Sequence, residues 1–355
     1  MNENKLSLQN VKRNAGIDVI KALAIIGVII IHTSTDTLVG DVKTSDFVFG
    51  LLWRCLAGAS VPLFLMCSGA LLLNPQKETP IKKLWTKNIL RIFVAMLFWA
   101  MLYKLLYLFY YGEITLHSVW ISFLNVLAFN QEFHLYYIHI TLLVYAFLPV
   151  TKIFINNASK KDLEYFLIIW LILGIVYPTV CIYKPFIYLS GYSLQWMMNA
   201  CYSAIGFGVL GYYLDNFRIS LKLSVTFLAV GFASIFGLTL FMSQKTGALY
   251  QHFLSGTNFF ITIFAIGSFS LCIKMCEFLK NKSWIYKSSL FLSKASFCIY
   301  LCHVIYIRGF TYFGFTVNFL PSVISIPLIM VCNLAGSIVI YLVLSRIPFV
   351  NKWLI

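Results

Sequence analysis

The sequence predicts an all-α protein that crosses a membrane about ten times, with both termini in the cytoplasm. Of its 355 residues, 60% are hydrophobic and only 11% are charged, and the mean hydropathy is +0.85. Soluble domains carry about 25% charged residues, so lipid must be the solvent for most of this chain. Long apolar runs recur along the chain, and basic residues alternate between successive connections. Both patterns are typical of polytopic membrane proteins.

Ten apolar runs are long enough to cross the hydrocarbon core. In chain order they cover 17–35, 47–73, 89–111, 134–153, 163–182, 195–214, 220–242, 255–277, 290–312 and 321–345. The apolar stretch 116–130 is short, which predicts either a re-entrant or interfacial helix or the true start of the fourth span.

The chain is expected to form one membrane-embedded domain. No hydrophilic block or repeat divides residues 1–355, and a short cytoplasmic segment, 1–16, precedes the first span. That span lacks a small-residue cleavage site, so we expect it to be retained as an anchor.

The basic residues set the orientation. Twenty of the 27 Lys and Arg residues lie in one set of alternate connections, and four lie in the opposite set. Positive residues mark the cytoplasmic side. The net charge of +15 is therefore explained by topology, and we expect no nucleic-acid partner. The nine cysteines show no metal-ligand spacing and lie mostly in apolar runs, so we expect neither a metal site nor a disulfide.

The first span contains three polar residues that its apolar setting makes costly. Asp18 and Lys21 are three residues apart and can pair on one helix face. His32 follows Lys21 by eleven residues, which places it within about 20° of the same face and about 16 Å further along the axis. Charged or titratable groups inside a span indicate function. The alternative is an interfacial ion pair with a histidine at the outer mouth and no chemistry.

Later segments add further candidates. Arg54 lies near the outer side of the second span, where it acts in the site or extends to the outer headgroups. Glu132, His134 and Tyr136 lie together at the outer mouth of the fourth span. They could serve as acid–base and binding groups, or they could belong to a solvated interfacial loop. His303 lies in the ninth span, and a lone histidine there is more often a core residue than a catalyst.

Together these residues resemble the acyltransferase-3 family, the multi-span bacterial membrane O-acyltransferases. The family's first-span pattern of Asp, Arg, ten residues and His is matched by Asp18, Lys21 and His32, with Lys in place of Arg. Asn88 replaces a second usual Arg. Four other patterns are matched in order by Arg54, Pro62, Phe64, Ser68 and Gly69; by Lys87 and Arg91; by His134, Leu135, Tyr136, Tyr137, Tyr145 and Pro149; and by Ser296, Tyr300 and His303.

The resemblance implies an O-acyltransferase of the bacterial cytoplasmic membrane, acting on groups other than aminoacyl groups. Acyl-CoA, most commonly acetyl-CoA, is its donor substrate, with no bound cofactor. The acceptor is a hydroxyl of a surface glycan or of a lipid-linked glycan precursor. Arg91 and Lys87 are then candidates for the coenzyme A phosphates.

The resemblance also suggests how the roles divide. His32 is expected to be the general base, with the oxyanion stabilised by Lys21, Arg54 or Tyr136 and with Asp18 holding Lys21. Acceptor binding falls to Glu132 and His134 in this scheme. Tyr300 and His303 complete the site, or His303 takes an intermediate acyl group. Lipid-linked sugar transport without acyl transfer is the rival function, and a glycan polymerase would need a larger outer loop. The oligomeric state is left open.

Overall fold

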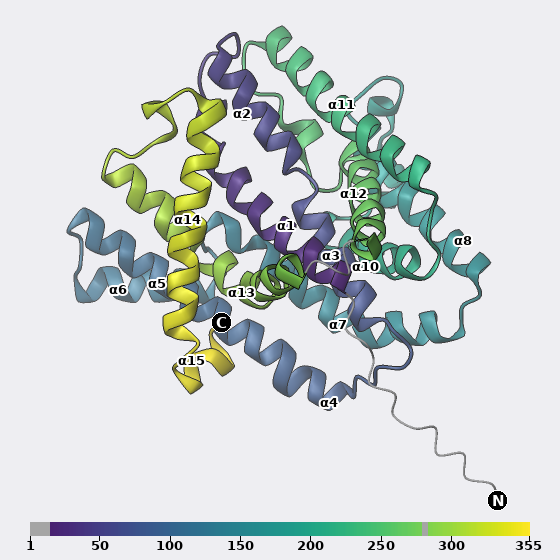
Figure 1. The fold of residues 1–355 in the computed structure, drawn as a ribbon, viewed down its shortest axis with the longest axis horizontal. Helices are drawn as coiled ribbons and strands as arrows, with labels where there is room; N and C mark the ends of the chain where they lie inside the picture. Colours follow the sequence, from purple (N-terminus) through teal and green to yellow (C-terminus); the bar gives the residue numbers. More distant parts are fainter. Residues whose placement is uncertain (1–14, 279–282) are drawn as a thin grey trace, which may run out of the picture.

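The computed structural model describes residues 15–278 and 283–355, and these residues form helices joined by short connections (Figure 1). Most of the expected segment 1–16, including Lys5, Lys12 and Arg13, lies outside the described residues, as do Lys280 and Lys282. No β-strand occurs in either described range, so the all-α class is confirmed. The helices are α1 Ala15–Thr33, α2 Ser45–Leu56, α3 Ser60–Leu72, α4 Ile81–Lys83, α5 Leu90–Tyr111, α6 Leu116–Leu127, α7 Tyr136–Asn157, α8 Lys160–Trp170, α9 Tyr177–Val180, α10 Ala200–Asn216, α11 Leu221–Thr246, α12 Phe259–Phe278, α13 Ser283–Tyr312, α14 Ser322–Leu344 and α15 Pro348–Trp353.

Nine helical segments of the described chain are long and apolar enough to cross a membrane. The sixth expected span, 195–214, corresponds to α10, whose 17 residues are fewer than those of the nine segments but still within the range of about 17–25 that can cross. Its last turn ends in the polar pair Asp215 and Asn216. α10 packs against α3, α7, α8 and α12, so protein encloses it on several sides.

The second expected span is broken in its middle. α2 ends at Leu56 and α3 begins at Ser60, and the hydroxyl of Ser60 donates to the carbonyl of Ala57 at 2.6 Å. α1 crosses close by, since a Cβ on Gly27 would lie 2.1 Å from the Ser60 hydroxyl oxygen. Interrupted helices occur in membranes where protein covers the freed backbone groups. The break leaves Arg54 in the last turn of α2, just before the connection to α3.

The short stretch 116–130 forms the 12-residue helix α6 and does not begin the fourth span, so that alternative is wrong. Thr115 caps α6, because its hydroxyl accepts from the Ser118 backbone N–H at 3.0 Å. The fourth crossing begins only with the 3₁₀ turn Phe133–Leu135 and continues as α7. Twelve residues rise about 18 Å, too little to cross the hydrocarbon core.

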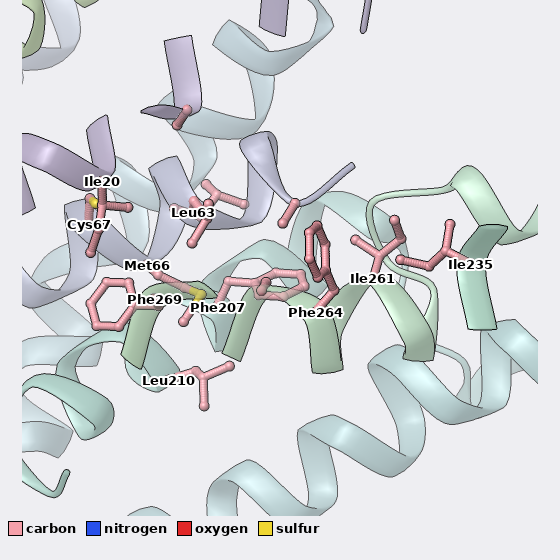
Figure 2. Packing of buried hydrophobic residues seen from close by; sticks show 14 of the residues in the cluster. Ile20, Leu63, Met66, Cys67, Phe207, Leu210, Ile235, Ile261, Phe264 and Phe269 are labelled. Carbon is pink, nitrogen blue, oxygen red and sulfur yellow. The ribbon is translucent and has the colours of Figure 1, made fainter. Parts of the chain in front are cut away.

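α1 lies at the centre of the bundle, against α13, α3, α12, α14 and α2 (Figure 1). Beside it, apolar side chains of α3, α10 and α12 interdigitate, among them Met66, Phe207 and Phe269 (Figure 2). The backbones of α3 and α10 meet directly, since a Cβ on Gly69 would lie 1.9 Å from the Gly208 carbonyl oxygen. Small residues allow such close approach, which compensates for the missing hydrophobic drive between helices in lipid.

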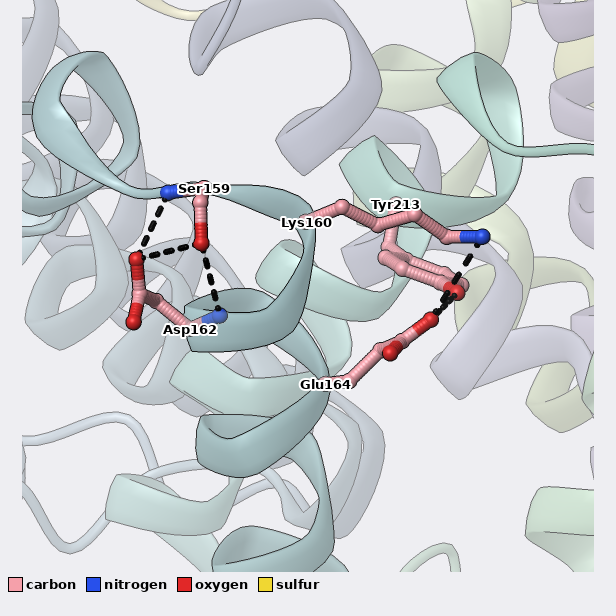
Figure 3. A network of polar contacts seen from close by, with 5 residues as sticks. All are labelled: Ser159, Lys160, Asp162, Glu164 and Tyr213. Carbon is pink, nitrogen blue, oxygen red and sulfur yellow. Dashed lines mark hydrogen bonds and ion pairs between the residues drawn. The ribbon is translucent and has the colours of Figure 1, made fainter.

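Polar contacts fix the start of α8 (Figure 3). Asp162 accepts from the backbone N–H of Ser159 at 2.8 Å, and the Ser159 hydroxyl accepts in turn from the Asp162 N–H at 3.3 Å. This reciprocal capping satisfies donors at the helix start. One turn later, Glu164 accepts from the Tyr213 hydroxyl at 2.6 Å and so ties α8 to α10.

Candidate active site

A cavity of about 860 Å³ opens among α1, α3, the start of α5, α7, the middle of α13 and the short helix α15. Its lining includes five basic side chains: Lys21, Lys87, Arg91, Lys294 and Lys352. Four of them belong to the set of connections rich in basic residues, and Lys21 lies in the first span. The positive-inside rule makes this the cytoplasmic end.

A π-helix, Leu84–Ile89, carries one wall of the cavity between α4 and α5. Thr86, Lys87 and Asn88 all line the cavity from this segment. π-helical turns are rare and occur often at functional sites. Asn88, which departs from the family pattern, therefore still contributes a polar side chain here.

The cavity mouth carries excess positive charge. Within the described residues, none of its five cations forms an ion pair with an Asp or Glu side chain. Arg91 donates to the main-chain oxygen of Ile355, the last residue of the sequence. Partial burial lowers the pKa of nearby Lys77, and the charges of Lys21 and Lys83 lower it further. Uncompensated like charges in a concave site attract an anion.

Aromatic residues close the inner end of the cavity. Tyr137 and Tyr300 line it, with ring centroids 5.6 Å apart, together with Phe64 and Ser296. The hydroxyl of Tyr300 donates to the backbone carbonyl of His134. Tyr300 thus links the cavity to the histidines beyond it.

Three histidines from distant parts of the chain meet on the far side of this layer. The ring centroid of His303 lies 5.2 Å from that of His32 and 5.3 Å from that of His134. α1, the start of the fourth crossing and α13 supply one histidine each. His134 and His303 are buried, whereas His32 remains partly accessible. Among the described residues, no three His, Cys, Asp or Glu side chains are placed to hold a metal ion.

Arg54 and Tyr136 lie beside the histidine cluster. The charge of Arg54 acts on both His32 and Tyr136. Tyr136 also lines a second cavity, of about 280 Å³, with Pro62 and residues 255–257. That cavity lies among the starts of α7, α10 and α12, on the side poor in basic residues. The charge of Arg54 thus acts both on the histidine cluster and on a residue that lines this second cavity.

Two acidic candidates are engaged in contacts that the sequence did not predict. Asp18 is buried and accepts from the Ser293 hydroxyl of α13 at 2.7 Å, while no ion pair joins it to Lys21 in the described chain. Glu132 accepts from Arg308 of α13 at 2.7 Å, an ion pair that holds the connection before His134.

The structure thus divides the sequence candidates into two groups. Lys21, Lys87, Arg91 and Tyr300 line the cavity, and His32, His134 and His303 cluster beyond it. The first-span stripe therefore runs between the two compartments. Sequence reasoning did not place Thr86, Ser293, Arg308 and Lys352 in the site. It marked Lys294 only as one of the basic residues of the cytoplasmic connections, although this lysine lies two residues before the Ser296 motif.

The comparisons with known proteins identify the family of the chain. The acyltransferase-3 family model, described as an acyltransferase domain, matches residues 14–342, nearly the whole chain. Comparison with curated proteins and with solved structures found no significant match. The family match includes both the cavity and the histidine cluster, apart from Lys352 and its neighbours near the end of the chain. The chain is a multi-pass membrane protein that belongs to the acyltransferase-3 family.

Proposed function

We propose that this membrane acyltransferase moves an acyl group, most commonly acetyl, from cytoplasmic acyl-CoA to a hydroxyl of a surface glycan or its lipid-linked precursor. One observation carries the proposal. A cavity with five basic side chains ends at Tyr300, one helical turn before the buried His303 and its two histidine neighbours. The membrane in question is the bacterial cytoplasmic membrane.

The donor binds in the cavity. Coenzyme A carries a diphosphate and a 3′-phosphate, and Lys and Arg side chains are the usual partners of such groups. Arg91, Lys87 and Lys294 take these phosphates at the mouth. The volume of about 860 Å³ falls within the range of small-molecule sites. The pantetheine arm then leads the thioester toward Tyr137 and Tyr300.

His32 is the general base in this proposal. It removes the proton of the acceptor hydroxyl while the hydroxyl oxygen attacks the thioester carbonyl carbon. The new C–O bond forms, the C–S bond breaks, and the coenzyme A thiolate leaves with the proton that His32 took. Negative charge on the carbonyl oxygen needs a fixed donor. Arg54 suits this role better than Lys21, because its charge acts on His32 whereas Lys21 lines the cytoplasmic cavity.

The acceptor approaches from the outer side, where Tyr136 lines the cavity of about 280 Å³. Tyr136 is half exposed, and aromatic rings offer an apolar face with a polar edge. Because Glu132 is already paired with Arg308, its role is to hold the connection that carries His134.

The test compares purified wild type with His32→Ala in detergent, using labelled acetyl-CoA and following binding and turnover. We expect saturable binding by both proteins and turnover by wild type alone, with a loss of about 100- to 10,000-fold in His32→Ala. His117→Ala, on the exposed face of α6, is the matched control and keeps wild-type turnover. If wild type binds neither acetyl-CoA nor longer acyl-CoAs, the proposal fails and lipid-linked sugar transport becomes the function to test.

A further inference from the structure

The ring of His303 is held in one tautomer. Its Nδ1 lies 2.7 Å from the carbonyl oxygen of Tyr300, one turn earlier on α13. A carbonyl oxygen only accepts hydrogen bonds, so Nδ1 must carry the proton. Nε2 is therefore left with a lone pair and can act only as an acceptor. This Nε2 is buried and has no hydrogen-bond partner in the described chain.

The backbone at His303 is fixed as well. The side-chain amide of Asn333, on α14, donates to the His303 carbonyl at 2.9 Å. Ser337 donates in turn to the amide oxygen of Asn333 at 3.2 Å, and all three residues are buried. A buried acceptor without a hydrogen-bond partner costs free energy. Because the backbone at His303 is fixed, the ring cannot avoid this cost by moving away.

His32 is the neighbour best placed to supply the missing donor. Two imidazoles joined by one N–H···N bond of about 3 Å have ring centroids about 5 Å apart. The ring centroids of His32 and His303 are 5.2 Å apart with an interplanar angle of 34°, although no hydrogen bond joins the two rings in the described structure. His134 is equally near, but its ring is inclined by 81°, so an in-plane N–H and an in-plane lone pair do not meet as readily.

We propose that His303 is a positioning residue that accepts an N–H from His32 and so holds the other ring nitrogen of His32 as the base. The inference deepens the proposed function, since it assumes that His32 is that base. A chain of contacts results, from the Tyr300 carbonyl through His303 to His32 and the acceptor hydroxyl. When His32 takes the hydroxyl proton, the N–H that it donates to His303 remains bonded to His32, and the new proton leaves with the coenzyme A thiolate.

Two substitutions at one position separate this role from a structural one. In His303→Asn, the amide N–H replaces Nδ1 and keeps the bond to Tyr300, but no atom reaches the Nε2 position. In His303→Gln, the longer amide places an acceptor near the Nε2 position. We expect kcat within about tenfold of wild type for His303→Gln and a loss of about 100-fold or more for His303→Asn, with unchanged KM for acetyl-CoA. A structural role predicts the reverse order, and that order overturns the proposal.

A spectroscopic readout does not depend on turnover. Protein labelled with ¹⁵N-histidine, assigned with His32→Gln, is examined by NMR at pH 8, above the ordinary pKa of a histidine side chain. We expect one tautomer of His32 in wild type and a mixture in His303→Asn. A single unchanged tautomer in His303→Asn overturns the proposal, including when both His303 variants are inactive. If His32→Ala retains turnover, the proposed function fails instead. If His32→Ala is inactive and both His303 variants match wild type, only the present inference fails.

Discussion

Two helix interfaces in this bundle are built in opposite ways. α3 meets α10 backbone to backbone, with Gly69 against Gly208, and a Cβ on Gly211 would lie 2.0 Å from the Met66 carbonyl oxygen. α1 meets α13 through polar side chains, with Asp18 bonded to Ser293 near the cytoplasmic end and His32 beside His303 near the other. The first interface leaves no space, and the second borders both compartments of the site. Close packing therefore supports the scaffold, while polar packing leaves room for chemistry.

The largest expected effect lies at the close-packed interface. In Gly69→Ala, the added methyl meets the Gly208 carbonyl, and neither backbone can yield without separating α3 from α10. We expect the free energy of unfolding to fall by about 3 kcal/mol. The measurement is the thermal midpoint of the detergent-purified protein.

Gly237→Ala is the matched control, because nothing lies within 4 Å of a Cβ at that position of α11. Its midpoint should equal or exceed that of wild type, since Ala favours a helix over Gly. Equal midpoints for the two variants would contradict the role of the glycine contact.

A smaller loss is expected at the polar interface. Ser293→Ala removes a hydroxyl that donates to the buried carboxylate of Asp18. Hydrogen bonds to charged groups contribute about 1.5–3 kcal/mol, and we expect a loss near the lower limit. Thermal midpoints are compared with those of Ser288→Ala, an exposed serine on the same helix that should leave stability unchanged. If Ser293→Ala has the thermal midpoint of wild type, the hydrogen bond between Ser293 and Asp18 does not stabilise the contact of α1 with α13.

Substitutions in the cavity lined by basic residues should lower the affinity for acetyl-CoA without lowering the stability of the protein. Arg91→Gln removes one of five cations, so we expect acetyl-CoA to bind about tenfold more weakly, with the difference shrinking at high salt. Isothermal titration of the purified variant at two salt concentrations measures both. Lys160→Gln serves as the control, because Lys160 is a cytoplasmic lysine outside the cavity that forms an exposed ion pair. This variant should bind acetyl-CoA like wild type. An affinity for Arg91→Gln that matches the control would exclude Arg91 from phosphate binding.

The smallest expected effect concerns the ion pair between Glu132 and Arg308. Arg308 is half exposed, and such pairs contribute about 0–1 kcal/mol. A double-mutant cycle with Glu132→Gln and Arg308→Gln, read by thermal midpoints, should give a coupling free energy in this range. A coupling above about 2 kcal/mol would contradict this expectation and show that the pair stabilises the connection before α7 far more than its exposure predicts.

The sequence was most informative where one helix carried the whole pattern. The positions of Lys21 and His32 follow from helical periodicity alone, and the structure places them in adjoining compartments as that spacing indicates. Apolar length likewise predicted the nine long spans, and the expected span 195–214 coincides with the shorter helix α10. The break at residues 57–59 was not predicted, because hydropathy stays high across it and only small residues mark it.

Contacts between distant helices could not be predicted. Nothing in one sequence indicates that α13 lies against α1, so the partners of Asp18 and Glu132 were missed. For the same reason, the meeting of His32, His134 and His303 could only be suggested by the family pattern. Side-chain direction at a π-helix also escapes a 3.6-residue periodicity, which is why Thr86 was not noticed.

The aromatic layer of Tyr137 and Tyr300 has an electrical consequence. It separates a hollow open to the cytoplasm from the histidines and Arg54, beyond which a second hollow faces outward. A membrane potential changes the energy of a crossing charge by about 2.3 kcal/mol per 100 mV. In the proposed reaction, the phosphates of the donor stay on the cytoplasmic side of this layer and do no work against the potential. The acyl group passes outward and the hydroxyl proton passes back to the coenzyme A thiolate, so no net charge crosses and the membrane potential is preserved.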